Sequence, residues 1–260
     1  MKRSILSLAA SLAFASILGA QTSLPPISPA QQAEYAKILK SVDAQANFDT
    51  SDLSATITIV STKPGKDQTK TEAKYFRRDK DKKFLVLLLQ PQVQKGQGYL
   101  QVDDSTWFYD PESREFSFFS LKDNFGDSEA RNDDFRSSSL ADDYTVVQAE
   151  ASTLGKLEVN ILTLQAKNDK VAFPRTKVWI EKGSNLLRKT EDYSLSNRLM
   201  RTQYYPSYAQ VGSRYIPTKM LFVDNLNEGE KSEMSLRDIS TGNIPDNIFT
   251  KQYVERVNNR

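Results

Sequence analysis

The stretch Asp52-Leu53-Ser54-Ala55-Thr56-Ile57-Thr58-Ile59-Val60 decides the fold class of this 260-residue chain. Apolar side chains at 53, 55, 57 and 59 alternate with hydroxyl side chains between them, which is the period of a half-buried β-strand. The preceding stretch differs, because apolar residues at 35, 39, 42 and 46 recur at helical spacing. Ser28 followed by Pro29 is a favourable helix start. We therefore expect a helix over 29–46 and a β-rich body that begins at Asp52.

Short segments of strand composition continue to residue 237, separated by turn signals. Residues 84–89 are apolar at every position, which predicts a strand with two buried faces. Residues 122–143 are rich in Asp, Asn, Ser and Gly, and we expect a long, mobile loop with a short helix near 133–141. Residues 244–254 favour a short C-terminal helix. The predicted fold class is mainly β, a single antiparallel sheet of roughly a dozen strands curled into a barrel or half-barrel.

The first twenty residues have the pattern of a secretory signal peptide. Lys2 and Arg3 precede an apolar stretch over 5–17, and small residues lead to Ala20. We expect cleavage near Ala20, a flexible leader over 21–28, a single domain over 29–260 and a periplasmic location. An uncleaved membrane anchor is the alternative, although the apolar run is short for a span. Loss of Lys2 and Arg3 leaves the chain without net charge, which does not suggest nucleic-acid binding.

The chain has no Cys and no His. This removes disulfides, thiol catalysis, His-based acid–base chemistry and the usual zinc ligands. A G-x-S-x-G elbow and a P-loop are also absent, and a Ser–Lys pair stays open as a minor alternative. The acidic pairs at 103–104, 133–134 and 142–143 do not match EF-hand spacing and are interpreted as solvated turns. We expect a non-enzymatic protein with no catalytic residues, no metal site and no cofactor.

Several segments together resemble the outer-membrane lipoprotein-sorting family of LolA/LolB-like carriers. Residues 75–91, 95–100 and 107–111 resemble the first half of the sequences in that family. Its closing half is similar to residues 177–180, 186–189, 199–202, 215–220 and 244–250. The likeness runs from about 29 to 257, and residues 131–140 depart from the Gly-Ser-Asp-Phe-Thr-like stretch usual in relatives.

The resemblance implies an unclosed antiparallel β-barrel with an N-terminal helix and short helices over its mouth. It also implies a periplasmic carrier that shields acyl chains of lipoproteins, phospholipids or fatty acids on their way towards the outer membrane. An inner-membrane exporter complex and an outer-membrane acceptor are the implied partners.

Apolar side chains of several strands are the candidates to line such a cavity. Periodicity does not separate a cavity from a filled core. The alternative is therefore a non-enzymatic envelope protein that binds protein partners and has a filled β core. The candidate lining residues are Ile57, Tyr75, Leu85, Leu87, Leu89, Leu100, Trp107, Val178, Ile180, Met220, Phe222 and Met234.

The signal-peptide pattern predicts that the exported protein begins at or near Gln21 and appears in the periplasmic fraction. N-terminal sequencing of the fractionated protein checks this. Intact residues 1–20 on a membrane-embedded protein would overturn it.

Overall fold

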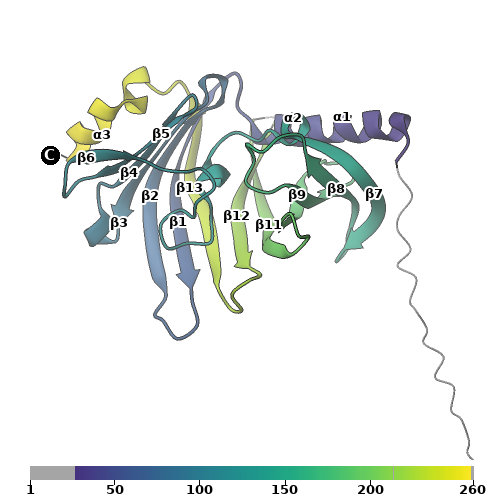
Figure 1. Ribbon diagram of the computed structural model, residues 1–260. Coiled ribbons are helices and arrows are strands. Elements are labelled where there is room, and N and C mark those ends of the chain that lie inside the picture. The colour runs from purple at the N-terminus through teal and green to yellow at the C-terminus, as the bar shows by residue number, and fades with distance from the viewer. Residues whose placement is uncertain (1–26, 213, 259–260) are drawn as a thin grey trace, which may run out of the picture.

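The structure is a computed structural model that describes residues 27–212 and 214–258. The predicted signal peptide and most of the predicted leader lie outside the described residues. Thirteen antiparallel strands form one sheet that curls without closing (Figure 1), which confirms the predicted fold class. The strands are β1 (Asp52–Thr62), β2 (Thr69–Arg78), β3 (Lys83–Gln90), β4 (Gly98–Val102), β5 (Ser105–Asp110), β6 (Glu115–Phe118), β7 (Tyr144–Leu154), β8 (Leu157–Ala166), β9 (Arg175–Glu181), β10 (Leu187–Tyr193), β11 (Leu199–Val211), β12 (Arg214–Asp224) and β13 (Lys231–Gly242).

Strand order follows the chain except at one place. The order is β6-β5-β4-β3-β2-β1-β13-β12-β11-β10-β9-β8-β7, so the first strand pairs with the last. The β1–β13 register runs from Asp52 opposite Gly242 to Thr62 opposite Lys231. This pairing joins two meanders into one sheet and leaves β6 and β7, which are consecutive in the chain, at its two ends.

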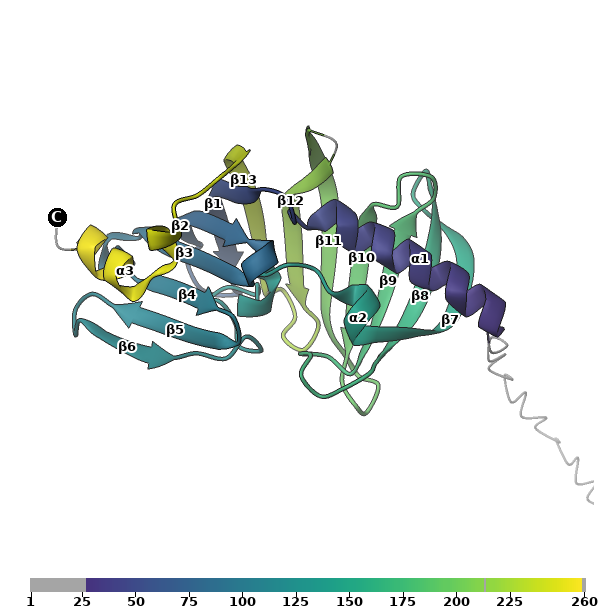
Figure 2. The same cartoon turned by 90° about the horizontal axis from the view of Figure 1, so that it is seen from above.

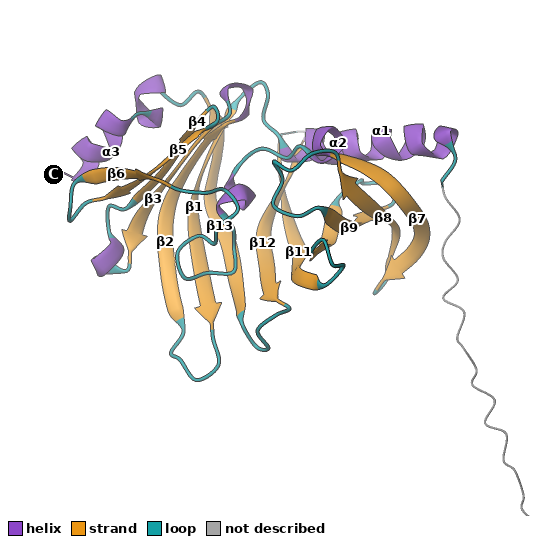
Figure 3. Ribbon diagram, in the orientation of Figure 1, coloured by secondary structure: helices purple, strands orange, loops and turns teal. Residues whose placement is uncertain are grey.

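Helix α1 (Pro29–Ala46) matches the predicted helix over 29–46. A capping box begins it: the Gln31 backbone N–H donates to Ser28 Oγ at 3.3 Å, and the Ser28 N–H donates to Gln31 Oε1 at 2.9 Å. The helix runs over the mouth of the curl across β7 to β11 (Figure 2) and buries Leu39 and Val42 there. Helix α2 (Leu140–Asp143) lies beside α1 in Figure 3, as expected for a helix over the mouth. Helix α3 (Lys251–Asn258) differs from this expectation, because its Val254 packs on the opposite face of the sheet against Leu85 and Leu100. None of the helices among the described residues has the length and apolar character needed to cross a bilayer.

Residues 119–139, here called the crossing segment, connect β6 to α2 and β7. They pack on one face of the sheet, which we call the inner face. Phe125, Ala130 and Phe135 of this segment are buried in one cluster with Ile57 and Val86 of the sheet. The composition predicted a long loop over 122–143, and the segment is largely without regular structure but is packed on the sheet; its predicted mobility stays a prediction. In place of the one helix expected near 133–141, there are a 3-10 turn (Asn132–Phe135) and α2.

Strand β3 is apolar on both faces because each face is covered. Phe84, Val86 and Leu88 belong to the inner cluster with the crossing segment. Leu85 faces the other way and packs with Leu100, Tyr109 and Val254 under α3. The continuous apolar run is thus explained by packing on both faces of the strand, against residues 119–139 on one face and against the C-terminal helix on the other.

Arg78 links three segments that are distant in the chain. Its Nε and Nη2 atoms donate to the two carboxylate oxygens of Asp52 at 3.0 and 2.8 Å. Its guanidinium also bonds Asp246 and the Ile244 carbonyl, beyond the end of β13. The Arg78 and Asp52 side chains are both buried. Burial alone would raise the pKa of Asp52, but the hydrogen bonds and charge of Arg78 outweigh it and lower that pKa below its ordinary value.

Asp52→Asn is expected to lower the free energy of unfolding by about 3 kcal/mol near neutral pH, because it breaks a buried ion pair. Asp81→Asn is the matched control, since Asp81 lies 3.8 Å from Arg78 but is 41% exposed, and it should cost less than about 1 kcal/mol. The lowered pKa of Asp52 means that its contribution is present above pH 3.8 and is lost as pH falls below it. Urea unfolding at several pH values checks both points. Equal losses in the two variants, or a loss unchanged in acid, would contradict the assignment.

Candidate binding cavity

A cavity of about 280 Å³ lies on the inner face between the sheet, α1 and the crossing segment. This volume is near the lower end of the roughly 300–1,000 Å³ found for small-molecule sites. The cavity has an apolar end and a polar end. The apolar end is lined by Phe48, Leu53, Ile57, Ile216, Met220, Phe222, Met234 and Leu236.

Sheet register builds the apolar end. Ile57 of β1 lies opposite Leu236 of β13, and Met234 of β13 lies opposite Met220 of β12. These four side chains therefore form a continuous apolar patch across three neighbouring strands. Two of the four are methionines, whose flexible side chains adapt to irregular apolar contacts. The patch can accept an apolar group without a demand for one fixed shape.

Arg201 of β11 organises the polar end. Its Nη atoms donate to the two oxygens of Asp134 in the crossing segment at 2.8 and 3.2 Å, and its Nε donates to Asp192 of β10 at 3.1 Å. Asp192 also accepts from Thr176 at 3.0 Å and from Gln203 at 3.2 Å. Burial would lower the pKa of Arg201, but the Asp134 and Asp192 carboxylates outweigh it and raise that pKa. The guanidinium therefore stays charged inside the fold.

Three polar atoms of the cavity-lining residues have no hydrogen-bond partner among the described residues. They are Arg77 Nε, Arg131 Nε and Thr190 Oγ1, and all three are buried. Arg77 Nε lies 2.8 Å from Asp79 Oδ1 in an ion pair, which leaves Arg131 Nε and Thr190 Oγ1 without a described partner of either kind. Buried polar atoms in native proteins are nearly always paired, with protein or with ordered water. Arg131 Nε and Thr190 Oγ1 have almost no accessible surface in this conformation, so a local movement of their side chains would be needed before either could donate to a water or to a bound molecule.

Helices close the mouth of the cavity through Asp43 of α1. Its carboxylate accepts from Ser138 Oγ at 2.5 Å and from the backbone N–H groups of Leu140 and Ala141 at 3.0 and 2.8 Å. Asn47 exchanges two further hydrogen bonds with the Ser138 backbone, each 2.7 Å long. The start of α2 is thus tied to α1, and both helices contribute lining residues.

The structure divides the predicted lining residues between the cavity and three other locations. Ile57, Tyr75, Met220, Phe222 and Met234 line the cavity. Val178 and Ile180 are buried beneath α1, and Leu85, Leu100 and Trp107 pack under α3. Leu87 is buried and Leu89 half-buried, and neither is among the lining residues. The inner face of β3 carries Phe84, Val86 and Leu88 instead, and a strand apolar throughout gave no signal for choosing between its faces.

The polar end was not foreseen from the sequence. Arg201 and Asp134 are 67 residues apart in the chain, and no spacing rule connects them. The weak signals present were the unusual composition of residues 131–140 and the matched segment 199–202. Both lie at this end of the cavity.

Comparison with known proteins supports the same architecture. A family model described only as an uncharacterized protein matches residues 80–256. A LolA superfamily protein from Nitrosomonas europaea has a TM-score of 0.73 at 22% identity, covering 84% of this chain and 97% of that one. A DUF1329 family protein from Desulfovibrio piger has a TM-score of 0.77 at 18% identity, covering 86% and 98%.

A domain from Vibrio parahaemolyticus described as an outer-membrane lipoprotein-sorting protein has a TM-score of 0.75 at 20% identity, covering 86% of this chain and 100% of that one. A search of curated proteins gives no match. These likenesses show that the chain has a LolA-like fold, as its sequence predicted.

Arg201→Lys keeps the charge but loses the planar fork that reaches Asp134 and Asp192 together. We expect a loss of about 1–3 kcal/mol in the free energy of unfolding and faster amide exchange over residues 131–136. Arg237→Lys is the control, because Arg237 is 53% exposed and its change should cost less than about 0.5 kcal/mol. Amide exchange by mass spectrometry gives the readout. Unchanged protection over 131–136 in Arg201→Lys would show that Arg201 does not hold the crossing segment.

Proposed function

The chain belongs to the family of uncharacterized proteins whose model matches residues 80–256, and within it we propose a non-enzymatic carrier that shelters acyl chains in the inner-face cavity. The observation that carries the proposal is the apolar patch of Ile57, Met220, Met234 and Leu236, which faces a cavity. Exposure of an acyl chain to water costs about 0.8 kcal/mol per methylene, so a carrier must offer equivalent burial. The LolA-like fold and the helices over the mouth agree with this role.

In this conformation the cavity has room for one acyl chain or part of one. The polar end would give the bound molecule a direction, because Arg131 and Thr190 carry unpaired polar atoms there that a side-chain movement could turn to a polar head, while the methionine patch takes the chain. The neighbouring charges are already paired with one another, as in Arg201 with Asp134. A neutral polar head such as an ester therefore fits this end better than a second strong charge.

The proposal includes a route through the cell envelope. The signal-peptide pattern over residues 1–20 supports export to the periplasm. The cargo would be acyl chains of lipoproteins, phospholipids or fatty acids. An inner-membrane exporter complex would be the donor, and an outer-membrane component the acceptor.

One observation favours a second candidate, an envelope protein that binds protein partners and has a filled core. The ring centroids of Phe125 and Phe135 in the crossing segment lie 4.7 Å apart in a tilted arrangement, and those of Phe125 and Tyr99 of β4 lie 4.6 Å apart. This part of the inner face is therefore filled by the protein's own aromatic side chains. The two candidates differ in whether the remaining cavity takes up an acyl chain.

Met220→Trp is expected to fill part of the cavity and to weaken binding of a fluorescent fatty acid by at least about tenfold. The fold should persist, with a loss below about 1.5 kcal/mol, because the half-buried side chain projects into open space. Leu85→Trp is the control: Leu85 is fully buried under α3, so overpacking should cost about 1–3 kcal/mol and leave probe binding intact. Probe titration and urea unfolding are the measurements. A wild-type protein that binds no acyl probe would remove the carrier and leave the filled-core candidate.

A further inference from the structure

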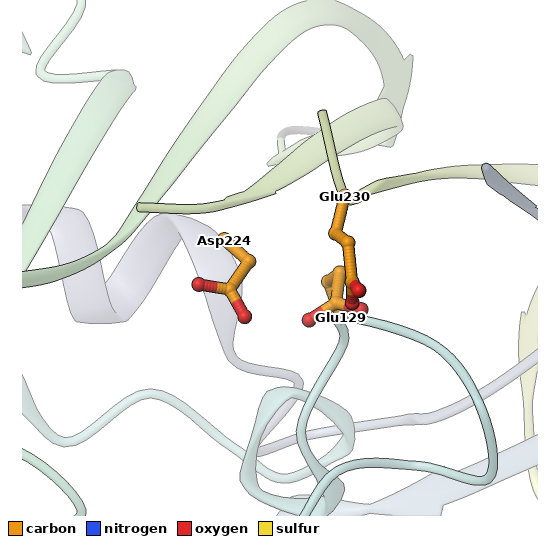
Figure 4. Close-up of side chains that lie close together, drawn as sticks. All are labelled: Glu129, Asp224 and Glu230. Carbon is orange, nitrogen blue, oxygen red and sulfur yellow. The ribbon is translucent and has the colours of Figure 1, made fainter. Parts of the chain in front are cut away.

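Three carboxylates converge at the end of the β12–β13 hairpin, away from the cavity lining. Glu129 belongs to the crossing segment, Asp224 ends β12, and Glu230 precedes β13. Figure 4 shows the three side chains pointing toward one another. One oxygen of each lies within 4.8 Å of the others. Segments far apart in the chain thus bring their acids to one point.

Glu129 is the unusual member of this cluster. It is only 6% exposed, and its Oε1 has no hydrogen-bond partner among the described residues. Its backbone N–H donates to the buried Ser232 Oγ at 2.9 Å, and that hydroxyl bonds Ser61 at 2.9 Å. The main chain is therefore fixed, and it holds a buried, unsatisfied carboxylate oxygen toward the other two acids.

Lys63 is the cation nearest this carboxylate among the described residues. Its Nζ lies 3.6 Å from Glu129 Oε1 and 3.6 Å from Glu230 Oε2. Both distances exceed the about 2.7–2.9 Å of a charge-assisted hydrogen bond. Three carboxylates and one ammonium also leave the cluster with two uncompensated negative charges, so Lys63 does not balance it.

The pKa values of two carboxylates in the cluster are shifted in opposite directions. Burial, and then the nearby Asp224 and Glu230, raise the pKa of Glu129 against the opposing effect of Lys63. For Asp224, burial would raise the pKa, but hydrogen bonds from Asn227 and the Leu226 backbone outweigh it and lower that pKa. Hydrogen bonds thus favour the ionised form of Asp224, whereas the single ammonium of Lys63 does not offset the effect of burial and of the two neighbouring acids on Glu129.

We propose that Glu129, Asp224 and Glu230 bind a divalent cation, with Ca²⁺ preferred over Mg²⁺. The donors are all carboxylate oxygens, which hard cations select. Ca²⁺ takes oxygens at about 2.3–2.6 Å in flexible geometry, so two ligands of one ion lie up to about 5 Å apart. Mg²⁺ demands shorter, near-octahedral contacts and dehydrates reluctantly. A bound dication cancels the two uncompensated charges with Lys63 still in place.

The site would tie the crossing segment to the β12–β13 hairpin. Glu129 is the only one of the three ligands in the crossing segment, so the ion would connect this segment to the sheet at a point separate from Arg201. The inference does not depend on acyl-chain binding. It adds a cation-dependent anchor to the segment that bounds the cavity.

The test is a calorimetric titration of the chelator-treated protein with CaCl₂ and separately with MgCl₂, together with thermal unfolding in each salt. We expect saturable Ca²⁺ binding, a melting temperature that rises with Ca²⁺, and a smaller response to Mg²⁺. Glu129→Gln should weaken Ca²⁺ binding by at least about tenfold. Glu230→Gln, at a half-buried position, provides the same test if Glu129→Gln does not fold.

Asp104→Asn is the matched control, because Asp104 is an exposed turn acid outside the cluster and its change should leave the Ca²⁺ response intact. Absence of Ca²⁺ binding by the wild type would overturn the proposal. A Ca²⁺ response that persists unchanged in both Glu129→Gln and Glu230→Gln would also overturn it, because the ion would then bind elsewhere.

Discussion

Pairing of the first strand with the last is the constraint on which the rest of this structure depends. Once β1 lies beside β13, β6 and β7 fall at the two ends of the strand order although they are consecutive in the chain. Their connection must therefore run from one end of the sheet to the other, and here it crosses the inner face, so that a polar stretch of about twenty residues packs within the fold. Phe125 and Phe135 supply its apolar contacts, and Tyr75 donates a 2.5 Å hydrogen bond to the Phe135 carbonyl. The cavity is the part of the inner face that this segment leaves uncovered.

Two buried arginines, Arg78 and Arg201, each hold together segments that are distant in the chain. Arg78 joins β1, β2 and the residues after β13, which secures the pairing of first and last strands. Arg201 joins β10 and β11 to the crossing segment. Desolvation makes buried ion pairs poor sources of net stability, but removal of one partner is costly. Their contribution here is to specify position, since an alternative path for residues 119–139 would leave Arg201 and Asp192 without Asp134.

Local patterns in the sequence predicted much more of the fold than of the candidate site. The alternation from Leu53 to Ile59 and the Ser28–Pro29 start gave the β-rich body and α1, because both depend on neighbours within one element. The sequence did not predict which side chains of β3 point to the inner face, since all six residues of 84–89 are apolar and the elements that cover them lie elsewhere in the chain. The polar end and the acid cluster arise from side chains that only the folded sheet brings together. The composition of 119–139 did not predict its packing, because the aromatic contacts of Phe125 and Phe135 and the pairing of Asp134 with Arg201 depend on the folded sheet.

Access to the cavity requires displacement of one of the two elements that cover it, the crossing segment or α1. Displacement of the crossing segment would expose Phe125 and Phe135 and break the buried pair of Arg201 with Asp134. Displacement of α1 would expose Leu39 and Val42 and break the hydrogen bonds of Asp43 and Asn47. The first opening exposes aromatic side chains and breaks a buried charge pair. The second exposes two aliphatic side chains and breaks the hydrogen bonds of Asn47 and three hydrogen bonds to the Asp43 carboxylate, which are worth about 1.5–3 kcal/mol each. Movement of α1 leaves the aromatic cluster and the Arg201–Asp134 pair intact. For the acyl chain that we propose, the crossing segment would then be the wall that stays in place while α1 admits the chain.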